Sequence, residues 1–135
     1  MATARELAPE EYEGVQAMFP DWFSASVQCT PGASFWPSLG QMRRADLVLV
    51  AEDDDGGVIG CGLIAAESAS LDWMVTKPGR SGDAFLVVAT EIVDRFGTGW
   101  GRVGNAALRE EYVAASGGHL VPDDPDDPSV LRWYR

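Results

Sequence analysis

A glycine loop between a short strand and a helix is the part of the sequence best suited to chemistry. Gly79 and Gly82 follow an apolar run and precede an amphipathic helix, with Lys77 and Arg80 beside them. The first backbone N–H groups of a helix have no partner within the helix, and the helix dipole adds partial positive charge, so this junction can hold a phosphate group. Glycines are also ordinary in a connection between a strand and a helix, and the loop alone leaves both interpretations open.

Composition limits the partners of the chain. The 135 residues carry a formal net charge of −11, and nucleic acid is disfavoured because its binding relies on Lys and Arg. No apolar run approaches the ~20 residues that cross a bilayer, and the start lacks a signal-peptide core, which predicts one cytoplasmic domain over residues 1–135. Cys29, Cys61 and the single histidine lack metal-ligand spacing, so we expect no metal site and two free buried thiols.

Apolar periodicity predicts an α/β (α+β) architecture with a mixed, mostly antiparallel central sheet flanked by helices. The expected elements are a helix over 9–19, ended by Pro20; a hairpin of strands 47–51 and 58–65; strand 70–75; a helix over 84–96; strand 100–103; a helix over 105–116; and two last strands over 119–122 and 129–134. One parallel strand pair should flank the long helix. The aromatic segment 21–46 is expected to form either a substrate lid or a small core that closes the sheet edge.

This order of elements resembles the GNAT family of acyl-CoA N-acyltransferases over nearly the whole chain. The family's cofactor loop follows a pattern of Gln or Arg, two residues, Gly, one residue, then Gly or Ala, and its second half matches Gly82-Asp83-Ala84. Gly79 stands at the first position, and Arg80 comes one residue too late. Asp83 departs further, because a carboxylate opposes a phosphate and would cap the helix itself. The resemblance implies that acetyl-CoA lies along Met74, Val75, Thr76, Lys77, Gly79, Arg80, Ser81, Gly82, Asp83 and Ala84.

A second match concerns an asparagine and a tyrosine. Family members commonly carry Asn at the end of the next strand and Tyr seven residues later, which is the spacing of Asn105 and Tyr112. The resemblance implies that Asn105 contacts the pantetheine arm and that Tyr112 protonates the departing CoA thiolate. An ordinary helix N-cap and a buried apolar stripe explain the same two residues, so a structural role stays open.

Transfer of an acyl group to an amine requires removal of a proton and stabilisation of an oxyanion. In the resembled fold, strand 71–75 splays from strand 100–103, so that the pantetheine amide pairs with the open edge and the backbone of residues 74–76 faces the thioester. Candidate general bases are Glu67 and Asp72, just before or within that strand. Both also fit polar residues on a solvent-facing strand.

The leading hypothesis is an N-acetyltransferase that transfers the acetyl group of acetyl-CoA to a primary amine of a small molecule or protein. The acidic surface favours a cationic acceptor. The alternative is a catalytically inactive GNAT-like binding or regulatory module, compatible with a phage origin and favoured by the degenerate loop. A third hypothesis, a nucleobase-modifying relative, is disfavoured by the charge. A homodimer through the final strands is also conceivable, because 130–134 should form a sheet edge.

Overall fold

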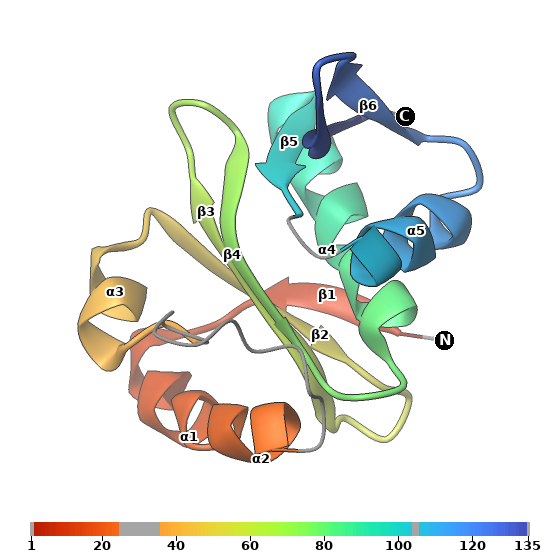
Figure 1. Ribbon diagram of the computed structural model, residues 1–135. Helices are drawn as coiled ribbons and strands as arrows, with labels where there is room; N and C mark the ends of the chain where they lie inside the picture. The colour runs from red at the N-terminus through yellow and green to blue at the C-terminus, as the bar shows by residue number, and fades with distance from the viewer. Residues whose placement is uncertain (1, 25–35, 104–105, 135) are drawn as a thin grey trace.

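The computed structural model describes residues 2–24, 36–103 and 106–134 and shows one seven-stranded sheet with helices on both faces (Figure 1). In sheet order the strands are β1 (Thr3–Glu6), β2 (Leu47–Glu52), β3 (Val58–Ala65), β4 (Ser70–Thr76), β5 (Gly99–Arg102), β7 (Asp127–Trp133) and β6 (Leu120–Asp124). The β4–β5 pair is parallel and the other pairs are antiparallel. The predicted fold class, hairpin and parallel pair are therefore confirmed.

The helices divide between the two faces. A 3₁₀ turn, η1 (Pro9–Glu11), leads into α1 (Tyr12–Gln16), and α2 (Phe19–Ser24) and α3 (Leu39–Arg44) share its face; α4 (Ser81–Phe96) and α5 (Ala106–Ala115) cover the other. Apolar side chains of α4, among them Phe85 and Ile92, pack on the inner strands in one core. A second core joins α1–α3 to the opposite face of β2–β4. No helix within the described ranges is long and apolar enough to cross a membrane.

Two predictions near the N-terminus were wrong. Strand β1 was missed because its burial follows no clean alternation and its sequence carries two charged residues. The single helix over 9–19 is interrupted, and Pro20 is the second residue of α2 instead of a terminator. Proline is tolerated in the first turn of a helix, where its missing N–H has no intrahelical partner.

The C-terminal strands also differ from expectation. The acidic segment around 123–127 is mostly strand, because β6 and β7 form a hairpin that closes between Asp124 and Asp127. β7 lies between β5 and β6, so the expectation that 130–134 forms the sheet edge was wrong. The edges of the described sheet are β1 and β6, and a dimer through the final strands loses that support.

Glycines on β3 bring α4 close to the sheet. A Cβ added at Gly60 would lie 2.7 Å from the Ala84 Cβ of α4, and one at Gly62 would lie 2.9 Å from Leu71 Cδ1 of β4 and 3.1 Å from Val88 Cγ1 of α4. These distances are too short for carbon atoms, so only glycine lets the first turns of α4 lie this close. Cys61, between the two, is a buried free thiol whose pKa is raised to about 12 by burial, as expected. Cys29 and residues 25–35 of the aromatic segment lie outside the described residues, whereas Trp22 is buried in the second core and Trp36 packs against it, as in the small-core alternative.

Candidate functional site

The parallel pairing of β4 and β5 stops after two residue pairs, Ser70 with Trp100 and Leu71 with Gly101. Beyond this point β4 is paired only with β3, and Figure 1 shows β5 separating from it. Asp72 is an extra residue in β4, because Leu71 and Trp73 are paired with the consecutive β3 residues Ile64 and Leu63. Such a bulge increases the local twist and bends the strand. The structure thus confirms the predicted splay and places Asp72 where it begins.

A cavity of about 150 Å³ lies where β4 and β5 diverge. Its walls include Asp72, Met74, Phe85, Leu108 and Tyr112. The ring of Tyr112 stacks on Phe85 with centroids 3.9 Å apart and an interplanar angle of 8°. This contact fixes the tyrosine ring in the core, with its side chain at the cavity wall.

The Tyr112 hydroxyl is buried and has no hydrogen-bond partner among the described residues. Burial raises the pKa of Tyr112 far above its ordinary value, and the nearby Thr76 side chain, which does not meet hydrogen-bond geometry with the Tyr112 hydroxyl, opposes a smaller part of that shift. The Thr76 hydroxyl itself is 2.7 Å from the Ser81 hydroxyl. Because an unpaired buried hydroxyl is costly, the arrangement suits a group that gains its partner only when a ligand is present. Tyr112 stays protonated over the working pH range.

The loop from β4 to α4 has one arginine, and carboxylates hold it. Gly79 adopts a left-handed φ of 81°, and Arg80, not Asp83, is the N-cap residue of α4. The predicted cap at Asp83 was therefore wrong; its carboxylate lies 3.2 Å from Arg80 Nε. Arg80 also forms a two-pronged ion pair with Asp53 of the β2–β3 turn, and this pairing lowers the pKa of Asp53 to about 2.

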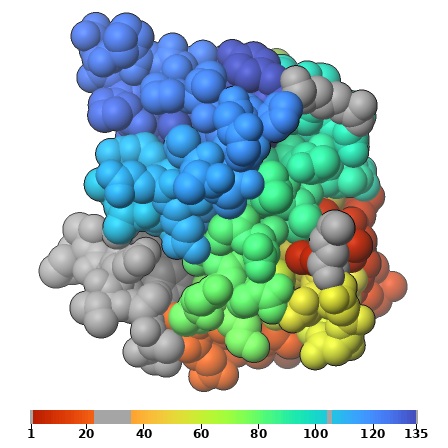
Figure 2. Space-filling model, turned by 90° about the vertical axis from the view of Figure 1, so that its right-hand side faces the viewer, coloured from red at the N-terminus to blue at the C-terminus, as the bar shows by residue number. Residues whose placement is uncertain are grey.

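A third carboxylate, that of Glu111, reaches the start of α4 from α5. The backbone N–H of Gly82 donates a hydrogen bond of 3.2 Å to Oε1 of Glu111. A Cβ at Gly82 would lie 3.3 Å from the Ala115 Cβ, so α5 packs closely here. Figure 2 shows the start of α4 in green, between α5 on one side and the yellow β2–β3 turn on the other. Neither Glu111 nor Asp53 carries a sequence signal for this role, because only the packing of α5 and the hairpin turn brings them to α4.

Comparison with solved structures identifies this architecture. The chain is similar to the PaiA N-acetyltransferase from Thermoplasma acidophilum, solved with coenzyme A, with a TM-score of 0.61, 20% identity and 100% and 99% of the two chains covered. It is also similar to a GNAT-family acetyltransferase from Listeria monocytogenes, with a TM-score of 0.59, 12% identity and coverage of 98% and 92%. The chain has the GNAT acetyltransferase fold. No protein-family model and no curated protein sequence matches it.

Another neighbour with the GNAT fold is a chimera of the spermidine N-acetyltransferase SpeG from Vibrio cholerae. Its TM-score is 0.55 and its identity 15%, with 97% of this chain and 92% of that chain covered. Identities this low define the fold and leave the activity to the geometry of the site.

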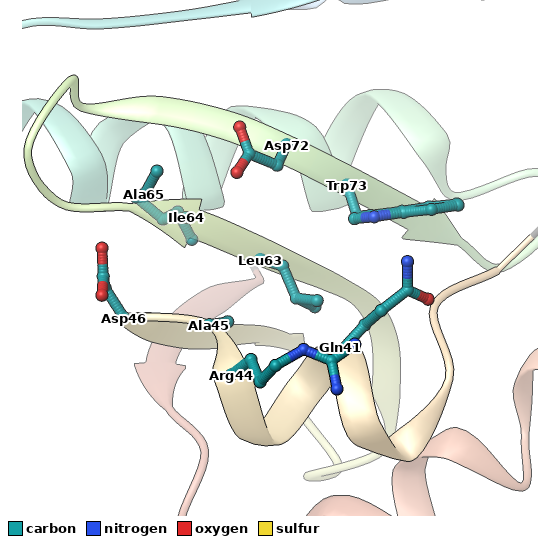
Figure 3. A pocket seen from close by; sticks show the side chains of 9 residues that line it. All are labelled: Gln41, Arg44, Ala45, Asp46, Leu63, Ile64, Ala65, Asp72 and Trp73. Carbon is teal, nitrogen blue, oxygen red and sulfur yellow. The ribbon is translucent and has the colours of Figure 1, made fainter.

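On the other face of the sheet of this GNAT fold, β3, β4 and α3 enclose a second cavity of about 220 Å³. Figure 3 shows Asp72 and Trp73 on the β4 wall, Leu63 below them, and Gln41 and Arg44 on the α3 wall. Asp72 lines both this cavity and the smaller one beside Tyr112. Its carboxylate accepts a hydrogen bond of 2.9 Å from the Ser70 hydroxyl. The bulged residue therefore lines cavities on both faces of the sheet.

The remaining site residues of the sequence analysis do not lie together. Glu67 is exposed in the turn between β3 and β4, outside the walls of both cavities and at the far end of β4 from the glycine loop. Val75 is buried in the core beneath α1–α3, whereas Met74 faces α4. Asn105 lies outside the described residues. The structure thus brings Asp72, Met74 and Tyr112 together and leaves Glu67 apart.

Proposed function

We propose that this chain is an N-acetyltransferase that moves an acetyl group from acetyl-CoA to a primary amine of a small molecule or protein. One observation carries the proposal: a carboxylate, Asp72, and an unpartnered buried hydroxyl, Tyr112, line the same cavity at the point where β4 loses its second neighbour. Acylation of an amine needs a base for the amine proton and an acid for the leaving thiolate, both beside the reacting thioester. The CoA-bound neighbour with the same fold supports the choice of donor.

Each residue has a definite part in this mechanism. Acetyl-CoA would supply the acetyl group as an activated thioester. Asp72 takes a proton from the acceptor amine, directly or through a water, as nitrogen bonds to the acetyl carbon. A backbone N–H of β4 near Met74 stabilises the oxyanion, because the open strand edge has donors free of a sheet partner. Tyr112 then gives its proton to the sulfur as the carbon–sulfur bond breaks.

The donor would lie along the open edge of β4 and the start of α4. The edge at Met74 to Thr76 can pair with the amide groups of the pantetheine arm. Ser81, Gly82 and Lys77 offer backbone donors and one positive charge for the pyrophosphate. The Glu111 carboxylate must leave the Gly82 N–H before a phosphate oxygen takes it. Asn105 remains a proposed contact of the pantetheine arm.

The test is a calorimetric titration of the purified chain with acetyl-CoA, followed by a screen of amine acceptors. Micromolar affinity, lost in Gly82→Val, supports use of the donor. Because that side chain would press on Ala115, the folding of the variant must be checked by its thermal transition. Loss of turnover in Asp72→Asn with unchanged acetyl-CoA affinity would support the base.

A non-catalytic binding or regulatory module is the second candidate, and the loop itself favours it. Two carboxylates hold Arg80, and Glu111 takes a backbone donor at the start of α4. Both features oppose a pyrophosphate. No binding at millimolar acetyl-CoA, with none restored in Glu111→Gln, would select this candidate.

A further inference from the structure

We infer that the acceptor carries an anionic group beside its amine, as an amino acid does, and that Arg44 binds this group. The inference rests on the proposed function and names its acceptor class. Arg44 is the single basic side chain that lines the 220 Å³ cavity between α3 and β4. The structure gives its guanidinium no ion pair within the described residues, whereas most other arginines there have one.

The walls of this cavity carry one positive side chain, Arg44, and two negative ones, Asp72 and Asp46; the Asp46 carboxylate accepts a hydrogen bond of 2.9 Å from the Ala66 N–H. Asp72 lies on β4 and Arg44 on α3, across the apolar side chain of Leu63 (Figure 3). If the amine of the acceptor approaches Asp72 from this side, the rest of the acceptor lies on the Arg44 side of the cavity. A guanidinium binds a carboxylate through two parallel hydrogen bonds, which makes it selective for planar anions.

The position of Arg44 is built into α3. Ser38 caps this helix through a capping box, in which the Ser38 hydroxyl accepts from the Gln41 N–H at 3.1 Å and the Gln41 side chain accepts from the Ser38 N–H at 2.8 Å. Gly40 stands one turn before Arg44, and a Cβ there would lie 3.1 Å from an Arg44 Nη1 atom. Glycine costs helix stability relative to alanine, and here it leaves the space in which the guanidinium lies.

The cavity favours a small acceptor with an apolar side chain. Drug-sized ligands occupy pockets of roughly 300–1,000 Å³, and this cavity of about 220 Å³ is smaller. Leu63, Ile64 and the half-buried Trp73 supply apolar surface. L-Leucine meets these requirements. The overall charge of −11 had predicted a cationic acceptor, but the charge beside the reacting amine decides specificity.

The experiment compares four acceptors at saturating acetyl-CoA with the full chain, by thiol release: L-leucine, L-leucinamide, 3-methylbutylamine and spermidine. We expect kcat/KM for L-leucine to exceed that for 3-methylbutylamine at least about tenfold. Arg44→Gln should bring this ratio close to one, because it raises KM for L-leucine and changes KM for 3-methylbutylamine, which has no carboxylate, very little. Arg43→Gln is the matched control, because Arg43 is exposed like Arg44 but does not line the cavity, and it should leave the ratio intact.

A preference for spermidine or 3-methylbutylamine, or an unchanged ratio in Arg44→Gln, would overturn the inference while leaving the acetyltransferase intact. If no amine is acetylated and acetyl-CoA does not bind, the proposed function fails instead. Calorimetry with L-leucine alone then tests the cavity by itself. Binding that weakens in Arg44→Gln and not in Arg43→Gln keeps Arg44 as the anion contact, and no binding at millimolar L-leucine removes it.

Discussion

Replacement of Tyr112 by phenylalanine should stabilise the protein and slow the reaction. The hydroxyl is buried, and no described residue accepts or donates a hydrogen bond to it. An unsatisfied buried hydroxyl costs roughly 1–3 kcal/mol, so its removal should raise the free energy of unfolding by about 1 kcal/mol. The stack on Phe85 is retained because phenylalanine keeps the ring. For a domain of this size the gain corresponds to a rise in Tm of about 3 °C.

The same substitution removes the proposed proton donor. Turnover should fall about 100-fold, the usual range for loss of a general acid, with acetyl-CoA affinity unchanged. Since burial raises the pKa of Tyr112, ionisation of this residue should cause no loss of turnover below about pH 10. Chemical denaturation of the unliganded chain measures stability, and steady-state thiol release measures turnover. Tyr134→Phe, at an exposed tyrosine, should change neither.

Two results would refute this reasoning separately. A Tyr112→Phe variant less stable than the native chain would show that the hydroxyl has a partner in the unliganded protein, such as Thr76 or a bound water. A more stable variant with undiminished turnover would show that Tyr112 is a packing residue and that another group protonates the thiolate.

Three further substitutions test the loop, the sheet and the acid response. Glu111→Gln should tighten acetyl-CoA binding about tenfold, because it removes a negative charge at the Gly82 N–H. Calorimetry measures this change. Equal tightening in Glu110→Gln, at an exposed neighbour, would indicate a general charge effect instead. Gly99→Ala should destabilise the protein by about 1–3 kcal/mol or more, because the new Cβ would lie 2.6 Å from Trp133 Cε2. Gly14→Ala should stabilise it, because no atom lies near the new Cβ and alanine favours a helix. The denaturant midpoints of the two variants must therefore move in opposite directions. Arg80 depresses the pKa of Asp53 to about 2, so this pair contributes stability above about pH 4 that is lost as the pH falls through 2. Asp53→Asn should therefore be less stable than the native chain at neutral pH, and the difference should vanish as the pH falls through 2. Acid titrations followed by circular dichroism measure this, and a pH-independent difference would count against the pairing.

Local sequence patterns determined most of the strands and the long helix. The apolar runs of β2 and β3 around an acidic turn, and the stripe that includes Phe85 and Ile92 on α4, set the period of each element. Periodicity works here because each element buries one or both of its faces. Those patterns, with the glycine loop and the spacing of Tyr112, were enough to predict the GNAT fold.

The missed elements were those whose form depends on neighbours. β1 is a short edge strand held by pairing to β2, and β7 lies inside the sheet only because β6 folds back on it. The spacing of residues along the sequence predicts neither the β1–β2 pairing nor the β6–β7 pairing. The position of the Arg80 side chain likewise depends on Asp53 and Asp83, which form ion pairs with it.

The same distinction applies to the site: the sequence suggested candidate residues, and the packing of the elements decided which of them lie together. The sequence supplied Tyr112 and Asp72 as candidates, but it gave Glu67 equal standing and assigned no role to Arg44 or Glu111. Tertiary structure separates them: a bulge in β4 puts Asp72 between two cavities, the turn holds Glu67 at the far end of the strand, and α5 brings Glu111 to α4. Periodicity reports which face of an element is buried, whereas the meeting of side chains from α3, β4 and α5 depends on how those elements pack.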